Sequence, residues 1–83
     1  MPRYLDHHPT PPNMPVEAVG QLKAKLQSGQ PDQFGVTGLN MFVGKDETWC
    51  YAEAASPEAI HQAHEAMGVK LGAGDVVEVQ NLI

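Results

Sequence analysis

Proline and glycine residues divide this chain of 83 residues into six short segments, and the order of these segments constrains the fold more than any other feature. The second and fifth segments have the apolar spacing of helices, whereas the others have the composition or alternation of strands. The fifth begins with Ser56-Pro57, a serine N-cap followed by proline at the first helical position. The predicted elements are strand 2–8, helix 15–28, strands 36–43 and 48–55, a helix from residue 57 to Gly68, and strand 75–82.

This order of elements is that of the ferredoxin-like split βαβ arrangement. We therefore predict an α+β fold, βαββαβ, with a four-stranded antiparallel sheet and two helices on one face, in which residues 1–83 form a single domain. A chain of this length builds only a small core. The single cysteine, Cys50, excludes an intrachain disulfide. A second subunit or a bound metal is the expected source of additional stability.

The four histidines of the chain lie in two places. His7 and His8 follow Asp6 in the first predicted strand, and His61 and His64 lie on the second predicted helix. Imidazole is the commonest transition-metal ligand, and alternation along a strand places Asp6 and His8 on one face. We therefore predict a metal site with ligands Asp6, His8 and His64. A purely structural hydrogen bond between the carboxylate and an imidazole is the alternative.

Alternation also predicts which side chains share each face of the sheet. The small residues Cys50 and Ala52 suit the space beneath the helices, so their neighbours in the same strand should point outward. Leu5, Val77 and Val79 are likewise predicted to face the helices. The open face is then expected to collect Tyr4, Asp6, His8, Trp49, Tyr51, Glu53 and Glu78.

An open face with this many aromatic side chains exposes more apolar area than a stable monomer leaves in water. We expect it either to be covered by a second copy of the chain or to form the floor of a ligand pocket. On this assignment His8 and His64 lie on opposite faces of the sheet, so that one site could include both only at a sheet edge or a subunit boundary. The predicted pocket residues are Tyr4, Trp49, Tyr51, Glu53 and Glu78.

Charge and composition exclude several classes of partner. The net charge is −5 and the five basic residues are scattered, which disfavours a nucleic-acid surface. No apolar run is long enough for a signal peptide or a membrane span, so we expect a cytoplasmic protein. The sequence has no phosphate-binding glycine loop and no cofactor fingerprint. Binding is therefore expected rather than catalysis, although His8 oriented by Asp6 could act as a general base.

Short motifs along almost the whole chain carry a family resemblance. They are Leu5-Asp6-His7-His8, Phe34-Gly35-Val36, Cys50-Tyr51-Ala52-Glu53-Ala54, Glu58-Ala59-Ile60 followed by His64, and Asp75-Val76-Val77-Glu78-Val79. In these motifs the chain resembles the short proteins grouped as domain of unknown function 4242, a family that includes a nickel-binding ferredoxin-like protein. The resemblance implies that fold and a metal. It places Asp6, His8, Cys50, Glu53 and His64 at the family-pattern positions.

The chain departs from the family pattern in its third segment, where Leu39-Asn40-Met41-Phe42 stands in place of a tyrosine and a tryptophan. The functional prediction is a protein that binds a divalent transition metal such as nickel, zinc or copper and forms a homodimer through its open sheet face. One alternative is a dimeric α+β barrel that binds or transforms a small organic ligand between stacked sheets. The other is a plain protein-interaction module.

Overall fold

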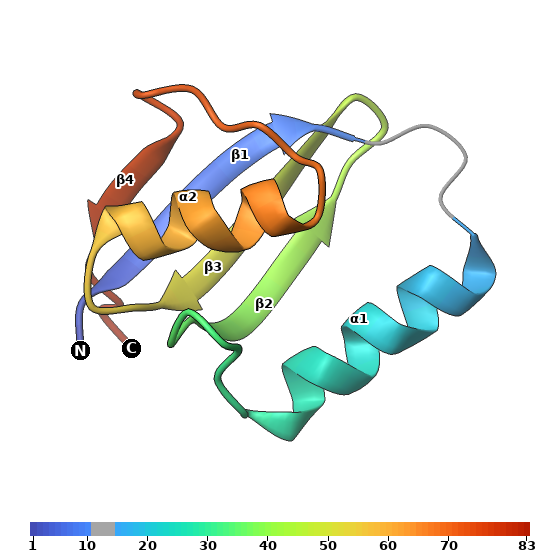
Figure 1. Cartoon of the computed structure of the whole chain (residues 1–83), viewed down its shortest axis with the longest axis horizontal. Coiled ribbons are helices and arrows are strands. Elements are labelled where there is room, and N and C mark those ends of the chain that lie inside the picture. The colour runs from blue at the N-terminus through green and yellow to red at the C-terminus, as the bar shows by residue number, and fades with distance from the viewer. Residues whose placement is uncertain (11–14) are drawn as a thin grey trace.

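A computed structural model describes residues 1–10 and 15–83 and confirms the predicted order of elements. Figure 1 shows the resulting α+β arrangement, in which β1 and β3 occupy the middle of the sheet. The elements are β1 (Arg3–Pro9), α1 (Val16–Ser28), β2 (Thr37–Val43), β3 (Glu47–Glu53), α2 (Pro57–Ala66) and β4 (Val76–Val79).

The sheet has the order β2-β3-β1-β4, and every neighbouring pair is antiparallel, as the ferredoxin-like fold requires. α2 crosses the sheet above β1 and β3, whereas α1 lies beside β2 (Figure 1). A Cβ atom at Gly38 of β2 would lie 2.8 Å from Leu26 of α1. Gly38 pairs with Ala52, which is buried in the core beneath α2, so both helices cover the same face. We call this the inner face and the opposite one the outer face.

The helix ends are formed by the residues that the sequence indicated. Ser56 accepts a hydrogen bond from the Ala59 backbone N–H at 3.4 Å, which caps the N-terminus of α2. Gly29 ends α1 in the left-handed region at φ 67°, where glycine lacks the steric penalty of other residues. α1 and α2 span 13 and 10 residues. Among the residues described, no helix has the length and apolar character needed to cross a membrane.

The predicted orientation of β1 is wrong. Tyr4, Asp6 and His8 are buried on the inner face, where they pair with Ala52, Cys50 and Thr48 of β3. Leu5 therefore lies on the outer face, opposite Tyr51. The small side chains of β3 leave room beneath the helices for the three larger polar residues of β1. Alternation correctly grouped the three polar residues, but the apolar character of Leu5 was a misleading guide to which group is buried.

The predicted orientation of β4 is also wrong, because here too the more apolar set of alternating residues is not the set that faces the helices. Val76 pairs with Asp6 and packs against the core, whereas Val77 pairs with Leu5 on the outer face and is 52% exposed. Glu78 pairs with Tyr4 and shares the inner side of the sheet with it. The five residues expected to form one ligand pocket are therefore divided between the two faces, with Trp49, Tyr51 and Glu53 on the outer one.

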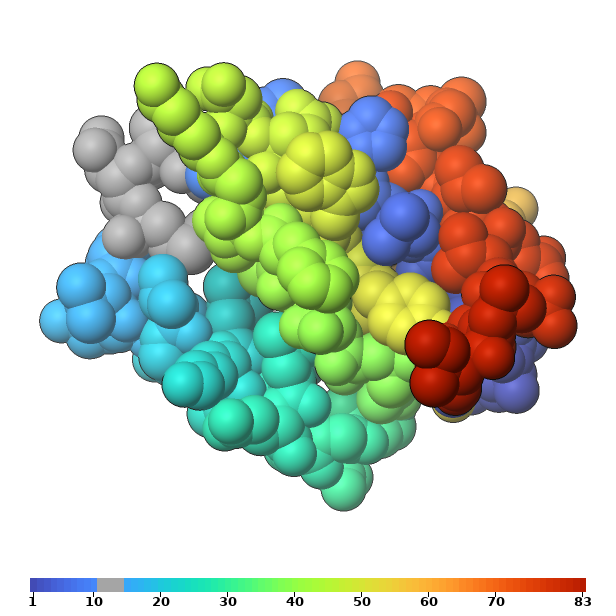
Figure 2. Space-filling view, turned by 180° about the vertical axis from the view of Figure 1, so that it is seen from behind, coloured from blue at the N-terminus to red at the C-terminus, as the bar shows by residue number. Residues whose placement is uncertain are grey.

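The outer face carries several exposed apolar side chains. Figure 2 shows this face, on which β2, β3, β1 and β4 follow one another from lime through yellow and blue to red. Phe42 and Trp49 pair across β2 and β3 and are 56% and 40% exposed. At the other end of the face, Arg3 forms an ion pair with Glu53 at 3.3 Å and donates to the Tyr51 hydroxyl at 3.2 Å.

Candidate metal centre

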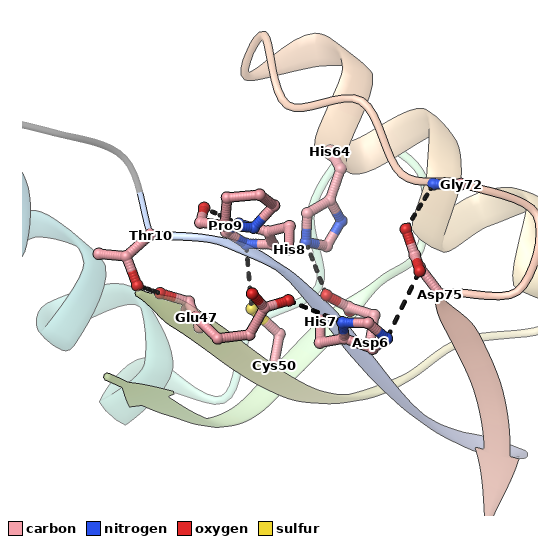
Figure 3. A network of polar contacts seen from close by, with 11 residues as sticks. Asp6, His7, His8, Pro9, Thr10, Glu47, Cys50, His64, Gly72 and Asp75 are labelled. Atoms are coloured by element: carbon pink, nitrogen blue, oxygen red, sulfur yellow. Dashed lines mark hydrogen bonds and ion pairs between the residues drawn. The ribbon is translucent and has the colours of Figure 1, made fainter. Parts of the chain in front are cut away.

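Three elements bring four potential metal ligands together on the inner face. β1 supplies Asp6 and His8, β3 supplies Cys50 directly opposite Asp6, and α2 supplies His64. Figure 3 shows His64 extending from α2 toward Asp6, with the ring of His8 and the sulfur of Cys50 beside them. One donor atom from each residue lies within 4.8 Å of every other, and all four side chains are buried. Within residues 1–10 and 15–83, this is the one such group of ligands.

Backbone hydrogen bonds orient both histidine rings. His8 Nδ1 lies 2.9 Å from the carbonyl oxygen of Pro9, and His64 Nδ1 lies 2.9 Å from that of Ile60. Because a carbonyl only accepts, each Nδ1 must carry its hydrogen, which directs Nε2 into the cluster. His8 Nε2 lies 3.9 Å from the sulfur of Cys50. Outer hydrogen bonds of this kind are typical of histidines that bind a metal through the other nitrogen.

Asp6 is the unusual residue of the cluster. Its side chain is 0% exposed, and neither of its carboxylate oxygens has a hydrogen-bond partner. His64 Nε2 lies 3.2 Å from Oδ1, which is an ion-pair distance without the alignment of a hydrogen bond. A buried carboxylate without hydrogen bonds is strongly destabilising unless a cation lies next to it. The position therefore favours either a protonated histidine or a metal ion.

The metal-free cluster holds protons at two of its ligands. Burial lowers the pKa of His64, but the adjacent Asp6 carboxylate, the Cys50 side chain and the Ile60 carbonyl, which favour the protonated ring, outweigh this effect and raise the pKa to about 10. Burial also raises the pKa of the Cys50 thiol. At neutral pH His64 is therefore an imidazolium beside the Asp6 carboxylate, and Cys50 is a neutral thiol. Both ligands must lose a proton before they bind a metal.

The four side chains fit a divalent transition metal in chemistry and in spacing. Two imidazoles, a thiolate and a carboxylate suit nickel, zinc or copper better than magnesium or calcium, which prefer oxygen ligands. A thiolate and a carboxylate together carry two negative charges, which balance the charge of a divalent ion. Ligand bonds of 2.0 to 2.3 Å allow two donors on one ion to lie up to about 4.6 Å apart. Donors at tetrahedral angles lie only about 3.3 to 3.8 Å apart, so the four donors, which lie within 4.8 Å of one another, would have to move closer together to bind one ion.

The structure brings together the three predicted metal ligands, Asp6, His8 and His64, although the sequence placed two of them on opposite faces. The error came entirely from the orientation of β1, because His64 lies on the buried side of α2 as predicted. Cys50 had been interpreted as a small buried apolar residue and was missed as a fourth donor. Two signals could have found it, namely the family-pattern position and the alternation that placed it beneath the helices.

Two other residues singled out in the sequence lie outside the cluster. Glu53 faces outward in its ion pair with Arg3. His7 also faces outward, where its ring contacts Glu47 at 2.8 Å and Asp75 at 3.4 Å (Figure 3). The hydrogen bond with Glu47 raises the pKa of His7. His7 thereby connects the beginning of β3 to the residue before β4, which is a structural role.

Comparison with known proteins gives one match. A family model described as "Nickel responsive protein SCO4226-like" matches residues 4–79 of the chain. No curated protein and no solved structure matches it. The matched region contains all four residues of the buried cluster.

Proposed function

The chain belongs to the SCO4226-like family of nickel-responsive proteins, and from this premise we propose that it binds one divalent transition metal ion in the buried cluster, with nickel as the physiological metal. The proposed ligands are Asp6, His8, Cys50 and His64. The observation that carries the proposal is the fully buried carboxylate of Asp6, which lacks a hydrogen-bond partner and is surrounded by three further donors. The likeness to the domain of unknown function 4242 family stays a prediction, because the matching family model has another description.

A bound ion would supply positive charge at the point where the fold buries a carboxylate and a thiol. The ligands come from β1, β3 and α2, so one ion would connect the middle of the sheet to the helix above it. Metal binding then contributes directly to the free energy of folding, which is the stabilisation expected for a chain with so small a core. A ligating cysteine must also stay reduced, and for this reason we propose a cytoplasmic location.

Nickel affinity is expected to increase with pH between pH 6.5 and 8. His64, whose pKa is raised to about 10, and Cys50 both carry protons in this range, and the ion must displace them. For one or two protons displaced, the association constant should increase by about 10-fold to 100-fold per pH unit. Calorimetric titration in two buffers of different ionisation enthalpy measures both the affinity and the number of protons released.

The Cys50→Ser variant is the control for this titration. It retains the imidazoles and the carboxylate but has no thiol proton to lose, so the number of protons released should decrease by about one. Zinc should show the same pH dependence as nickel, because the competing protons are the same. Nickel binding that does not change with pH would contradict the assignment of His64 and Cys50 as ligands.

We further propose that a second copy of the chain covers the outer face. Phe42, Trp49 and Val77 leave apolar area exposed there, next to the partly buried Leu5 and Tyr51. A contiguous apolar patch on a sheet face is typical of a subunit interface. The opposite charges of Arg3 and Glu53 at one end of the patch could also pair between two copies.

The Trp49→Glu variant is expected to be monomeric. A charge at this position would be buried without a partner if two outer faces met, and this would weaken association by at least about 100-fold. Sedimentation equilibrium should give twice the mass of one chain for the parent and the mass of one chain for the variant. Glu17→Gln, at an exposed position in the first turn of α1, is the matched control and should remain dimeric. A parent protein that is monomeric at high concentration would contradict the proposal.

A further inference from the structure

A mainly apolar cavity of about 210 Å³ lies next to the metal cluster, between the inner face of the sheet and the two helices. The four cluster residues form one part of its wall. Its volume exceeds that of the engineered cavity of about 150 Å³ that binds benzene in another protein. It therefore has room for one aromatic ring with a short substituent. The apolar residues that line it include Leu22, Leu26, Met41, Ala63, Met67 and Val69.

The cavity exists because α1 does not pack fully onto the sheet. No residue of α1 is buried, and Leu22 and Leu26 line the cavity while remaining partly exposed. At this end the close approach of Leu26 to Gly38 sets the distance between α1 and β2. Apolar side chains that line a space of this size lack the packing contacts that a filled core would give them. A ligand that filled it would add the contacts that α1 lacks.

The residues that line the cavity favour a neutral ligand. Asp32 lines the cavity, but its Oδ1 already accepts hydrogen bonds from the backbone N–H groups of Phe34 and Val36, which hold this carboxylate against its own loop. Lys25 is exposed at the rim and can keep its charge in water. His64 and Asp6 also line the cavity, but they pair with each other at 3.2 Å. A charged ligand inside the cavity would therefore lose its hydration without gaining an unpaired partner of opposite charge.

We propose that this cavity binds a small, neutral, mainly apolar molecule of about the size of a substituted aromatic ring. The inference goes beyond metal binding and does not rest on it. It also moves the predicted small-molecule pocket from the outer face of the sheet to the inner one. Of the five residues predicted for that pocket, Tyr51 is the one that lines this cavity.

Titration of the metal-free 83-residue chain with toluene tests the proposal, with a chelator present to exclude any effect of metal. Met41 and Met67 line the cavity, whereas Met1 is exposed elsewhere, so the methionine methyl resonances report the location of binding. We expect saturable shifts of the Met41 and Met67 methyl signals and none for Met1. Benzoate, which adds a negative charge to a ring of the same size, should bind at least about tenfold more weakly.

Two variants on the same helix complete the test. Leu22→Trp fills the cavity and should weaken toluene binding by at least about tenfold, whereas Val19→Trp, at an exposed position that does not line the cavity, should bind as the parent does. The comparison of toluene with benzoate stands even if Leu22→Trp fails to fold. The absence of saturable shifts, tighter binding of benzoate, or unchanged binding in a folded Leu22→Trp variant would each overturn the proposal. Because no metal is present, these outcomes are separate from any failure of nickel to bind.

Discussion

The His64→Ala variant is expected to lose more than about 100-fold in nickel affinity, since changing groups that only support a ligand already reduces affinity by 10-fold to 100-fold. His64 is the one ligand from α2, and its Nε2 approaches Asp6 more closely than any other cationic group described at the site. Without this imidazole the remaining ligands come from the sheet alone. His8→Ala should have a comparable effect, because His8 supplies the second oriented Nε2.

His61→Ala is the matched control for His64→Ala. His61 lies one turn earlier on the same helix, is partly exposed and does not belong to the cluster. Its replacement should leave nickel affinity unchanged within a factor of about two. Competition titration with a chelator of known affinity measures all three variants on one scale. If His61→Ala and His64→Ala lost affinity equally, the metal would be bound on the surface of α2 rather than in the buried cluster.

The second prediction concerns the stability of the metal-free protein. We expect the buried cluster to lower its free energy of unfolding. Asp6 and His64 form a buried pair that is not aligned as a hydrogen bond. Replacement of such a pair by apolar residues of similar volume is often neutral or stabilising by about 1 to 4 kcal/mol. The double variant Asp6→Val with His64→Leu should therefore be at least as stable as the metal-free parent. Valine also suits the strand conformation of β1.

Urea denaturation with and without nickel tests this expectation. Nickel at 100 times its dissociation constant should stabilise the parent by about 2.7 kcal/mol and leave the double variant unchanged. The single variant His64→Leu is the control, because it leaves the Asp6 carboxylate buried without a cation and should be destabilised by about 3 to 5 kcal/mol. A double variant less stable than this single variant, or one stabilised by nickel, would contradict the proposed role of the pair.

The order and ends of the elements could be predicted because local residues determine them. Ser56 and Pro57 begin α2, Gly29 ends α1, and the small residues of β3 indicate which of its faces is covered. β4 is an exception, since the structure forms it over Val76–Val79 rather than over 75–82. Its neighbour is β1 alone, so the residues that extend beyond that pairing do not join the strand.

The orientations of β1 and β4 could not be obtained from hydrophobicity. Alternation shows that Tyr4, Asp6 and His8 share one face, but the choice of face depends on what lies opposite. Each polar group is too costly to bury alone, and the burial becomes tolerable only when Cys50 from β3 and His64 from α2 arrive at the same place. That arrangement is a property of the tertiary structure. The rule that the more apolar face of a strand is buried therefore fails where the strand contributes to a buried polar cluster.

The most direct test of the proposed metal centre is a crystal structure of the nickel-loaded protein with anomalous diffraction data measured at the nickel absorption edge. The account predicts one strong anomalous peak within bonding distance of a carboxylate oxygen of Asp6, Nε2 of both His8 and His64, and the sulfur of Cys50. A peak located elsewhere, for example between His61 and Glu65 on the surface of α2, would contradict the account, as would a protein that stays free of nickel while its buried cluster is intact.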